Sequence, residues 1–141
     1  MTENSPHKPS IPPARVLVVD DDALCVAALV LMLSEDDRIA VIDRARDGAE
    51  GVERALQLEP DVVLMDVQMP VMDGLEATRR IRSLLRSTRV VLISGSDVPG
   101  IAESAHRAGA SAFLKKGCDP ELLLDALAGR ARLRQVPTPA V

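Results

Sequence analysis

Five side chains that could bind a metal ion or handle a phosphate are spread along this chain of 141 residues. Three are carboxylates, one is a hydroxyl and one is an amine: Asp20, Asp21, Asp66, Ser94 and Lys116. Carboxylates held close together repel one another, and a hard divalent cation such as Mg²⁺ relieves that repulsion. Mg²⁺ often works beside a phosphate, whose charge a lysine also neutralises. The set therefore predicts phosphoryl transfer, with Asp66 attacking phosphorus in line and Ser94 hydrogen-bonding the attached phosphoryl group.

These side chains lie at or next to the ends of apolar runs that are typical of buried strands. The clearest run is Val62-Val63-Leu64-Met65, which leads directly to Asp66. The predicted strands are Arg15–Asp20, Ile39–Ala45, Asp61–Met65, Arg89–Ile93 and Ser111–Leu114. If all five are parallel, their ends lie on one edge of the sheet, where open α/β sheets bind ligands. That edge would bring the five side chains together.

The segments between the predicted strands carry apolar residues at the spacing of a helix. The first helix is predicted from the recurrence of Leu24, Ala27, Ala28 and Leu31. The second has a predicted inner stripe of Ala49, Val52 and Leu56. The third runs from about Gly74 to Leu85, Gly109 ends the fourth, and Asp119-Pro120-Glu121 begins the fifth. Strict alternation of strands and helices predicts a doubly wound, five-stranded parallel α/β sheet with helices on both faces.

The composition indicates one globular domain. Apolar residues make up 47% of the chain, Phe113 is the only aromatic residue, and the net charge is -4. That charge gives no support for nucleic-acid or anionic-membrane binding as the main function. Cys25 and Cys118 are far apart and in no metal or redox spacing, so we expect two reduced thiols.

The two ends of the chain are predicted to lie outside the domain. Residues 1–13 are polar, contain four prolines and have no signal-peptide pattern, which predicts a flexible leader and a cytoplasmic protein. The domain is expected over residues 14–131, with a flexible tail over residues 132–141. That tail carries Pro137 and Pro139 and no further helical pattern, which favours a natural end there.

Four segments resemble the receiver domain of two-component response regulators, over about Arg15 to Arg130. They are residues 16–22 (VLVVDDD), 60–75 (PDVVLMDVQMPVMDGL), 90–95 (VVLISG) and 109–116 (GASAFLKK). Gly117 stands where many members of the family have a proline. Together with residues 74–80, this variant is most similar to receivers of the NarL/FixJ type. The resemblance implies a flavodoxin-like (βα)5 fold with strand order 2-1-3-4-5.

The resemblance also implies a metal site. Asp66 matches the phosphoacceptor. Asp21 and Asp66 would bind Mg²⁺ directly together with the backbone carbonyl of Gln68, and Asp20 would act through a metal-bound water. Mn²⁺ would be able to substitute for Mg²⁺.

Three further residues match the phosphate-binding and switch positions of the family. Lys116, rather than its neighbour Lys115, matches the lysine that assists catalysis by Asp66. Ser94 and Phe113 match the switch pair, in which the hydroxyl moves toward the phosphate and the ring turns inward. By analogy with the family, Gln68 is expected to affect the lifetime of the phosphorylated state.

The function implied is a phosphorylation-dependent switch rather than an enzyme with a separate substrate. A histidine kinase or phosphotransfer protein would be the donor. The face of the fourth helix, fifth strand and fifth helix would then meet a downstream protein or a second copy in a homodimer. No membrane contact is expected, because no stretch approaches membrane-spanning length. No direct DNA contact is expected either, because the chain stops short of a helix-turn-helix domain. The chain would be a stand-alone receiver or one separated from its output domain.

Two alternatives remain open from the residues. A haloacid dehalogenase-type phosphatase also uses an aspartate nucleophile with Mg²⁺, but it needs a second aspartate where Gln68 stands. A phosphorylation-independent interaction module would be favoured if the acidic pair or Lys116 were missing, and all are present.

Overall fold

The sheet has five parallel strands in the order β2-β1-β3-β4-β5. The computed structural model describes residues 11–129. Its strands are β1 (Ala14–Val19), β2 (Ile39–Ala45), β3 (Val62–Asp66), β4 (Arg89–Ser94) and β5 (Ala112–Lys115). The predicted fold class and strand order are therefore confirmed. Residues 1–10 of the leader predicted over residues 1–13, and the whole tail predicted over residues 132–141, lie outside the described residues.

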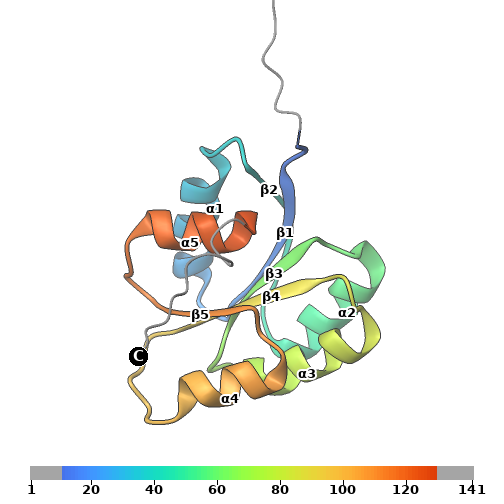
Figure 1. Cartoon of the computed structure of the whole chain (residues 1–141), viewed down its shortest axis with the longest axis vertical. Coiled ribbons are helices and arrows are strands. Elements are labelled where there is room, and N and C mark those ends of the chain that lie inside the picture. Colours follow the sequence, from blue (N-terminus) through green and yellow to red (C-terminus); the bar gives the residue numbers. More distant parts are fainter. Residues whose placement is uncertain (1–10, 130–141) are drawn as a thin grey trace, which may run out of the picture.

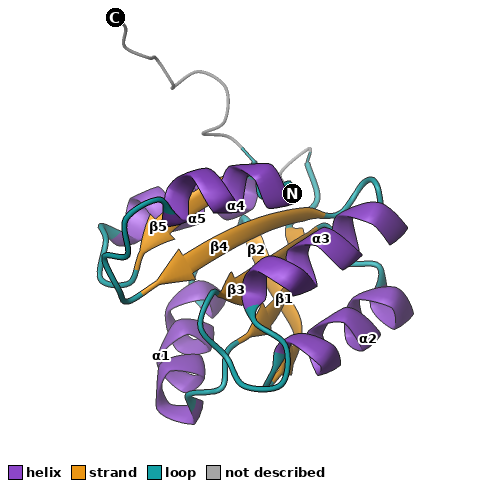
Figure 2. Ribbon diagram, turned by 90° about the horizontal axis from the view of Figure 1, so that it is seen from below, coloured by secondary structure: helices purple, strands orange, loops and turns teal. Residues whose placement is uncertain are grey.

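Five helices alternate with the strands and form a layer on each side of the sheet (Figures 1 and 2). They are α1 (Ala23–Ser34), α2 (Gly48–Leu58), α3 (Gly74–Leu84), α4 (Ile101–Ala108) and α5 (Pro120–Ala128). α1 and α5 cover one face, while α2, α3 and α4 cover the other. Among the residues that the structure describes, no helix has the length and apolar character needed to cross a membrane.

The central strands are buried on both faces. Val16 and Val18 of β1 pack toward α1 and α5, and Leu17 and Val19 pack toward α2 and α3. Every residue of β3 is buried. A parallel sheet covered on both sides requires such continuous apolar runs, so the strand ends are held in fixed positions by the core.

The buried face of α1 differs from the face marked by the predicted apolar spacing. Leu24 and Leu31, which defined that spacing, are 82% and 68% exposed. Val26 and Leu33 are the buried residues of this helix. Because α1 is apolar around almost its whole circumference, spacing located the helix but could not identify its inner side.

The inner stripe of α2 was also predicted wrongly. Ala49 is exposed and Leu56 is 43% exposed, whereas Gly48, Gly51 and Ala55 are buried. A Cβ added at Gly51 would lie 3.0 Å from a methyl carbon of Val19. The helix packs so closely on β1 that small residues form its contact stripe, and of the predicted stripe only Val52 packs, partly buried, against the core.

Candidate functional site

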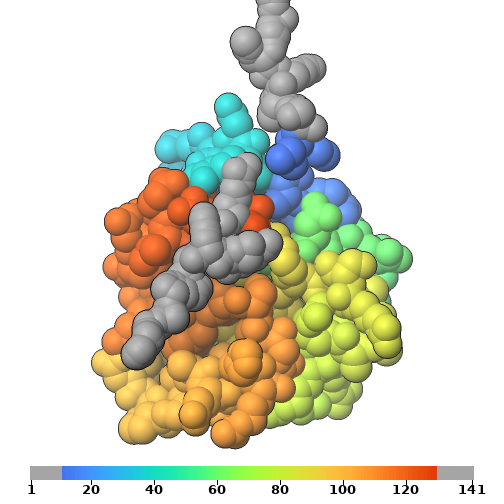
Figure 3. All heavy atoms as spheres, viewed as in Figure 1, coloured from blue at the N-terminus to red at the C-terminus, as the bar shows by residue number. Residues whose placement is uncertain are grey.

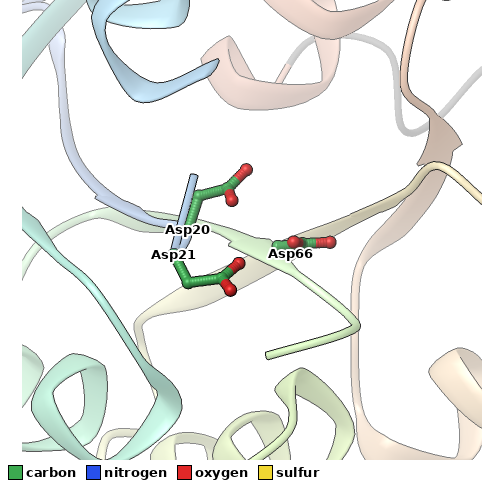
Figure 4. Close-up of side chains that lie close together, drawn as sticks. All are labelled: Asp20, Asp21 and Asp66. Carbon is green, nitrogen blue, oxygen red and sulfur yellow. The ribbon is translucent and has the colours of Figure 1, made fainter. Parts of the chain in front are cut away.

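Three carboxylates meet at the carboxyl edge of the sheet. Asp20 and Asp21 directly follow β1, and Asp66 is the last residue of β3. One carboxylate oxygen of each lies within 4.8 Å of the others. Figure 4 shows the three side chains at these neighbouring strand ends. Asp20 and Asp66 are 1% and 4% exposed, while Asp21 is open to solvent.

Lys116 brings a positive charge into this cluster from the turn after β5. Its Nζ lies 3.0 Å from Oδ2 of Asp20 and 3.4 Å from Oδ2 of Asp66. Its backbone N–H donates to the carbonyl of Ser94 at 2.9 Å, which fixes the turn beside β4. Burial lowers the pKa of Lys116, but its close contact with Asp20 and the charges of Asp66 and Asp20 outweigh that effect and raise the pKa to about 12. The amine therefore stays charged.

The neighbouring Lys115 lies outside the cluster. Its ammonium group pairs with Asp97, in the loop after β4. Two adjacent lysines thus have different surroundings, and Lys116 is the one that reaches the carboxylates.

The surroundings of Asp66 raise its pKa from 3.8 to about 6. Burial is the main cause, and the charge of Asp20 adds to it. The charge of Lys116 and the backbone N–H of Gln68 act in the opposite direction. Asp66 is thus ionised at neutral pH, but it carries its charge at an energetic cost that a nearby cation would reduce.

The oxygen atoms of the cluster fit a hard divalent cation. Within residues 11–129, Oδ2 of Asp20 is buried and accepts no hydrogen bond of good geometry, although the ammonium group of Lys116 is near. Asp22 is already occupied, since its side chain accepts from the backbone N–H groups of Leu24 and Cys25 and caps α1. Three close carboxylates are a suitable donor set for Mg²⁺, because one has a buried oxygen that pairs with a lysine but accepts no hydrogen bond from a described residue, and another is open to solvent.

A hydroxyl and an amide lie beside the carboxylates. Ser94 ends β4 and is fully buried. Its Oγ lies 3.3 Å from Oε1 of Gln68, and it accepts from the backbone N–H of Ser96 at 3.1 Å. The loops after β3 and β4 are therefore connected through this hydroxyl.

Phe113 lies one strand further from the carboxylates. It pairs with Leu92 across β4 and β5 and is half-buried against the core beneath α3 and α4. The metal role of the Gln68 carbonyl and the switch role of Phe113 stay predictions.

The loop after Asp66 folds tightly back onto the strand. The backbone N–H of Gly74 donates to the carbonyl of Val67 at 2.8 Å, and a Cβ at Gly74 would lie only 2.2 Å from the carbonyl oxygen of Asp66. Asp73 caps α3 by accepting from the N–H of Glu76. Asp73 therefore has a structural task at the start of α3.

Sequence reasoning missed a group of arginines beside the carboxylates. Arg44, Arg46 and Arg54 line a cavity of about 360 Å³ whose walls also include Asp20 and Asp21. The sequence offers one signal for this group, the charged end of the otherwise apolar strand β2. Strand alternation alone does not place these arginine side chains on one face.

Comparison with known proteins identifies the family. The protein-family model for the response regulator receiver domain matches residues 16–128. Among solved structures, the signal receiver domain of NarL from Mycobacterium tuberculosis is 36% identical with a TM-score of 0.81, covering 88% of this chain and all of that one. The complex described as CheX-CheY-BeF3-Mg+2 from Borrelia burgdorferi is 28% identical with a TM-score of 0.76, covering 84% of this chain and 89% of that one.

Curated relatives are longer proteins. A protein-glutamate methylesterase/protein-glutamine glutaminase of Myxococcus xanthus is 46% identical over 111 residues, which is 77% of this chain and 31% of the relative. The nitrate/nitrite response regulator protein NarL of Escherichia coli K12 is 35% identical over 133 residues, which is 92% of this chain and 62% of NarL. The chain thus spans less than two thirds of each, and their activities are not carried over to it.

Proposed function

This chain belongs to the response regulator receiver domain family, and we propose that it is a switch in which Asp66 accepts a phosphoryl group from a histidine kinase or phosphotransfer protein. The observation that carries the proposal is the convergence of Asp20, Asp21 and Asp66 within 4.8 Å, with Lys116 beside two of them. This arrangement supplies both a nucleophile and positive charge for a transferring phosphoryl group.

In the proposed transfer, an oxygen of Asp66 attacks phosphorus while the N–P bond of phosphohistidine breaks. The imidazole nitrogen keeps the electron pair and then takes a proton from solvent. Because the pKa of Asp66 is about 6, the carboxylate is ionised and available at neutral pH. No other substrate is turned over, so the protein acts as a switch and not as a separate enzyme.

A divalent ion is part of this proposal. Asp21, Asp66 and the backbone carbonyl of Gln68 would hold Mg²⁺ directly, with Asp20 acting through a water. When bound, Mg²⁺ neutralises charge on the phosphoryl oxygens. The buried Oδ2 of Asp20, which pairs with Lys116 but accepts no hydrogen bond within residues 11–129, and the exposed carboxylate of Asp21 support this assignment.

Lys116 and Ser94 would receive the phosphoryl group. Without a phosphoryl group, Lys116 contacts Asp66 and Asp20. Its ammonium group would also bind an oxygen of the phosphoryl group once this is attached to Asp66. The Ser94 hydroxyl would exchange its contacts with Gln68 and Ser96 for a hydrogen bond to the same group.

The proposed output is a change of the face formed by α4, β5 and α5. The movement of Ser94 would pull the loop after β4 and allow Phe113 to turn inward. The segments of α4 and α5 share one side of the molecule (Figure 3), and Lys115 links β5 to Asp97 of that loop. A downstream protein or a second copy of the chain would recognise the changed face.

The test is to incubate the protein with acetyl phosphate and Mg²⁺ and to measure its intact mass. We expect the mass increase of one phosphoryl group, which is lost in Asp66→Ala. The matched control is Asp47→Asn, since Asp47 caps α2 and asparagine caps helices equally well. An unmodified wild-type protein, or an adduct that persists in Asp66→Ala, would overturn the proposal.

A further inference from the structure

The arginine-lined cavity beside the carboxylates is not used by the proposed switch. It has a volume of about 360 Å³, which is within the range of small-ligand sites. Asp20 and Asp21 line it on the side of the acidic cluster, and α1 contributes Ala23 and Val26. The lining does not include Asp66, so the cavity extends from the cluster away from the proposed nucleophile.

A bulge in β2 decides which side chains enter this cavity. Val16 pairs with Val41, but the next residue of β1, Leu17, pairs with Asp43, so Ile42 is an extra residue in β2. Such an extra residue reverses the faces of all side chains that follow it.

The core confirms the reversal. Ile39 and Val41 pack toward α1 and α5, whereas Ala45 packs into the cluster beneath α2 and α3. Arg44 therefore lies on the α1 side of the strand and lines the cavity, while Asp43 lies on the α2 side and pairs with Arg54 at 2.6 Å. Without the bulge, Arg44 would lie on the other face.

Three arginines and three carboxylates line the cavity, but the arginines differ in their ion pairs. Arg54 pairs with both Asp43 and Glu50, and Glu50 also accepts from the backbone N–H of Arg46 at 2.7 Å. The pKa of Glu50 is lowered mainly by that backbone hydrogen bond, so the carboxylate remains charged. Within the described part of the chain, no carboxylate forms an ion pair with the guanidinium of Arg44. Arg44 is thus a cation available to a ligand, near Arg54, whose position is set by its two ion pairs.

We propose that this cavity binds the distal anionic group of a small acyl phosphate, so that the receiver prefers donors that carry a second carboxylate or phosphate. The inference rests on the proposed function. In an in-line transfer, Asp66 attacks phosphorus, the bond between phosphorus and the acyl oxygen breaks, and the acyl carboxylate leaves with the electron pair. The leaving group departs on the side opposite Asp66, and the cavity opens on the Asp20 and Asp21 side of the cluster.

The chemistry of the wall selects such a ligand. A guanidinium binds carboxylate or phosphate through two parallel hydrogen bonds. A donor without a second anion, such as acetyl phosphate, would leave Arg44 without this contact. One additional charge-assisted contact is expected to change affinity on the order of tenfold.

The test uses unreactive analogues with a phosphonate in place of the phosphate. Phosphonoalkanoates of three to five carbons carry the distal carboxylate, and alkylphosphonates of the same lengths lack it. Each is titrated with Mg²⁺ present while backbone amide NMR shifts are followed. We expect at least one phosphonoalkanoate to bind on the order of tenfold more tightly than its alkyl partner, with shifts over Arg44–Arg46.

Two variants complete the experiment. Arg44→Gln should remove the preference for the carboxylate, and Arg107→Gln, on the exposed side of α4, should retain it. Equal binding of both series, or a preference that survives in Arg44→Gln, would overturn the inference. If wild type is phosphorylated by acetyl phosphate but shows no preference, only this inference fails. If acetyl phosphate does not modify wild type at all, the proposed function itself fails.

Discussion

Carboxylates at the two edges of the sheet have opposite surroundings, which raise a pKa at the carboxyl edge and lower one at the amino edge. At the carboxyl edge, Asp20 and Asp66 are buried together, and the pKa of Asp66 rises to about 6. At the amino edge, Arg38 holds Asp36, Glu121 and Asp125 at 2.9 to 3.0 Å. Hydrogen bonds from Arg38 lower the pKa of Asp36 to about 2.

Other side chains of the amino edge satisfy backbone groups that the helices leave unpaired. Arg15 donates to the carbonyls of Leu58 and Glu59 at the end of α2. Arg89 donates to the carbonyls of Ala126 and Leu127 at the end of α5. Cations at helix C-termini are stabilising. One edge therefore stabilises the fold, while the other holds close carboxylates whose mutual repulsion a bound cation would relieve.

The largest effect is expected from disturbing the backbone beneath Asp66. Gly74→Ala should lower the free energy of unfolding by about 3 kcal/mol, because the new Cβ would overlap the carbonyl oxygen of Asp66. Urea denaturation measures this. Gly95→Ala is the control at the same edge, since the nearest atom to its Cβ would be 3.7 Å away. Similar stabilities for the two variants would show that the carboxyl edge does not depend on this close approach.

Removing a charge from the carboxyl edge should stabilise the protein. Asp66→Asn is expected to raise the free energy of unfolding at pH 7 by about 2 kcal/mol, because it removes a buried charge next to Asp20. Thermal or urea unfolding without divalent ions measures the change. A destabilised variant would contradict the contrast between the two edges.

The same contrast predicts opposite pH windows. The pKa of Asp66 is higher in the folded state than its ordinary 3.8, so its contribution to stability is lost as pH rises from about 4 to about 6. The pKa of Asp36 is lower in the folded state, so its contribution is lost as pH falls from about 4 to about 2. Comparing wild type with Asp66→Asn and with Asp36→Asn across pH isolates each group. Differences that do not change with pH in these windows would refute the assignment.

A smaller loss of stability is expected when the amino edge is broken. Arg38→Met should lower the free energy of unfolding by about 1 kcal/mol, since the three carboxylates it binds are partly exposed and reach water. Phosphorylation of Asp66 by acetyl phosphate should be unchanged. Arg80→Met is the control, because Arg80 pairs only on the exposed surface with Glu76. A variant that keeps full stability but loses phosphorylation would reverse the roles of the two edges.

The smallest effect concerns the lifetime of the phosphorylated state. Gln68→Ala removes the side chain that contacts the Ser94 hydroxyl, which should change the rate of phospho-aspartate hydrolysis by about two- to fivefold. The decay of the phosphorylated mass after removal of the donor measures this rate. The control is Ser83→Ala, on the surface of α3, which should leave the hydrolysis rate as in wild type. An unchanged decay in Gln68→Ala would show that the Gln68 side chain does not affect hydrolysis.

The positions of Asp20, Asp66, Ser94 and Lys116 could be predicted from local sequence because each belongs to the end of a strand. A short apolar run is typical of a strand covered on both faces, and regular alternation with helices places the ends of such strands on one edge. The resemblance to receivers rests on four short segments in a fixed order, and it implied the strand order. Both the family and the strand order were confirmed.

Features that depend on which faces of the elements meet could not be predicted from local sequence. The sequence of α1 is apolar on nearly every side, so packing alone selects Val26 and Leu33 over Leu24 and Leu31. The bulge at Ile42 has no local signal, because the register of β2 is set by its pairing with β1. Local sequence was enough to predict which groups gather around Asp66, whereas the long-range pairing of β2 with β1 places Arg44 beside them.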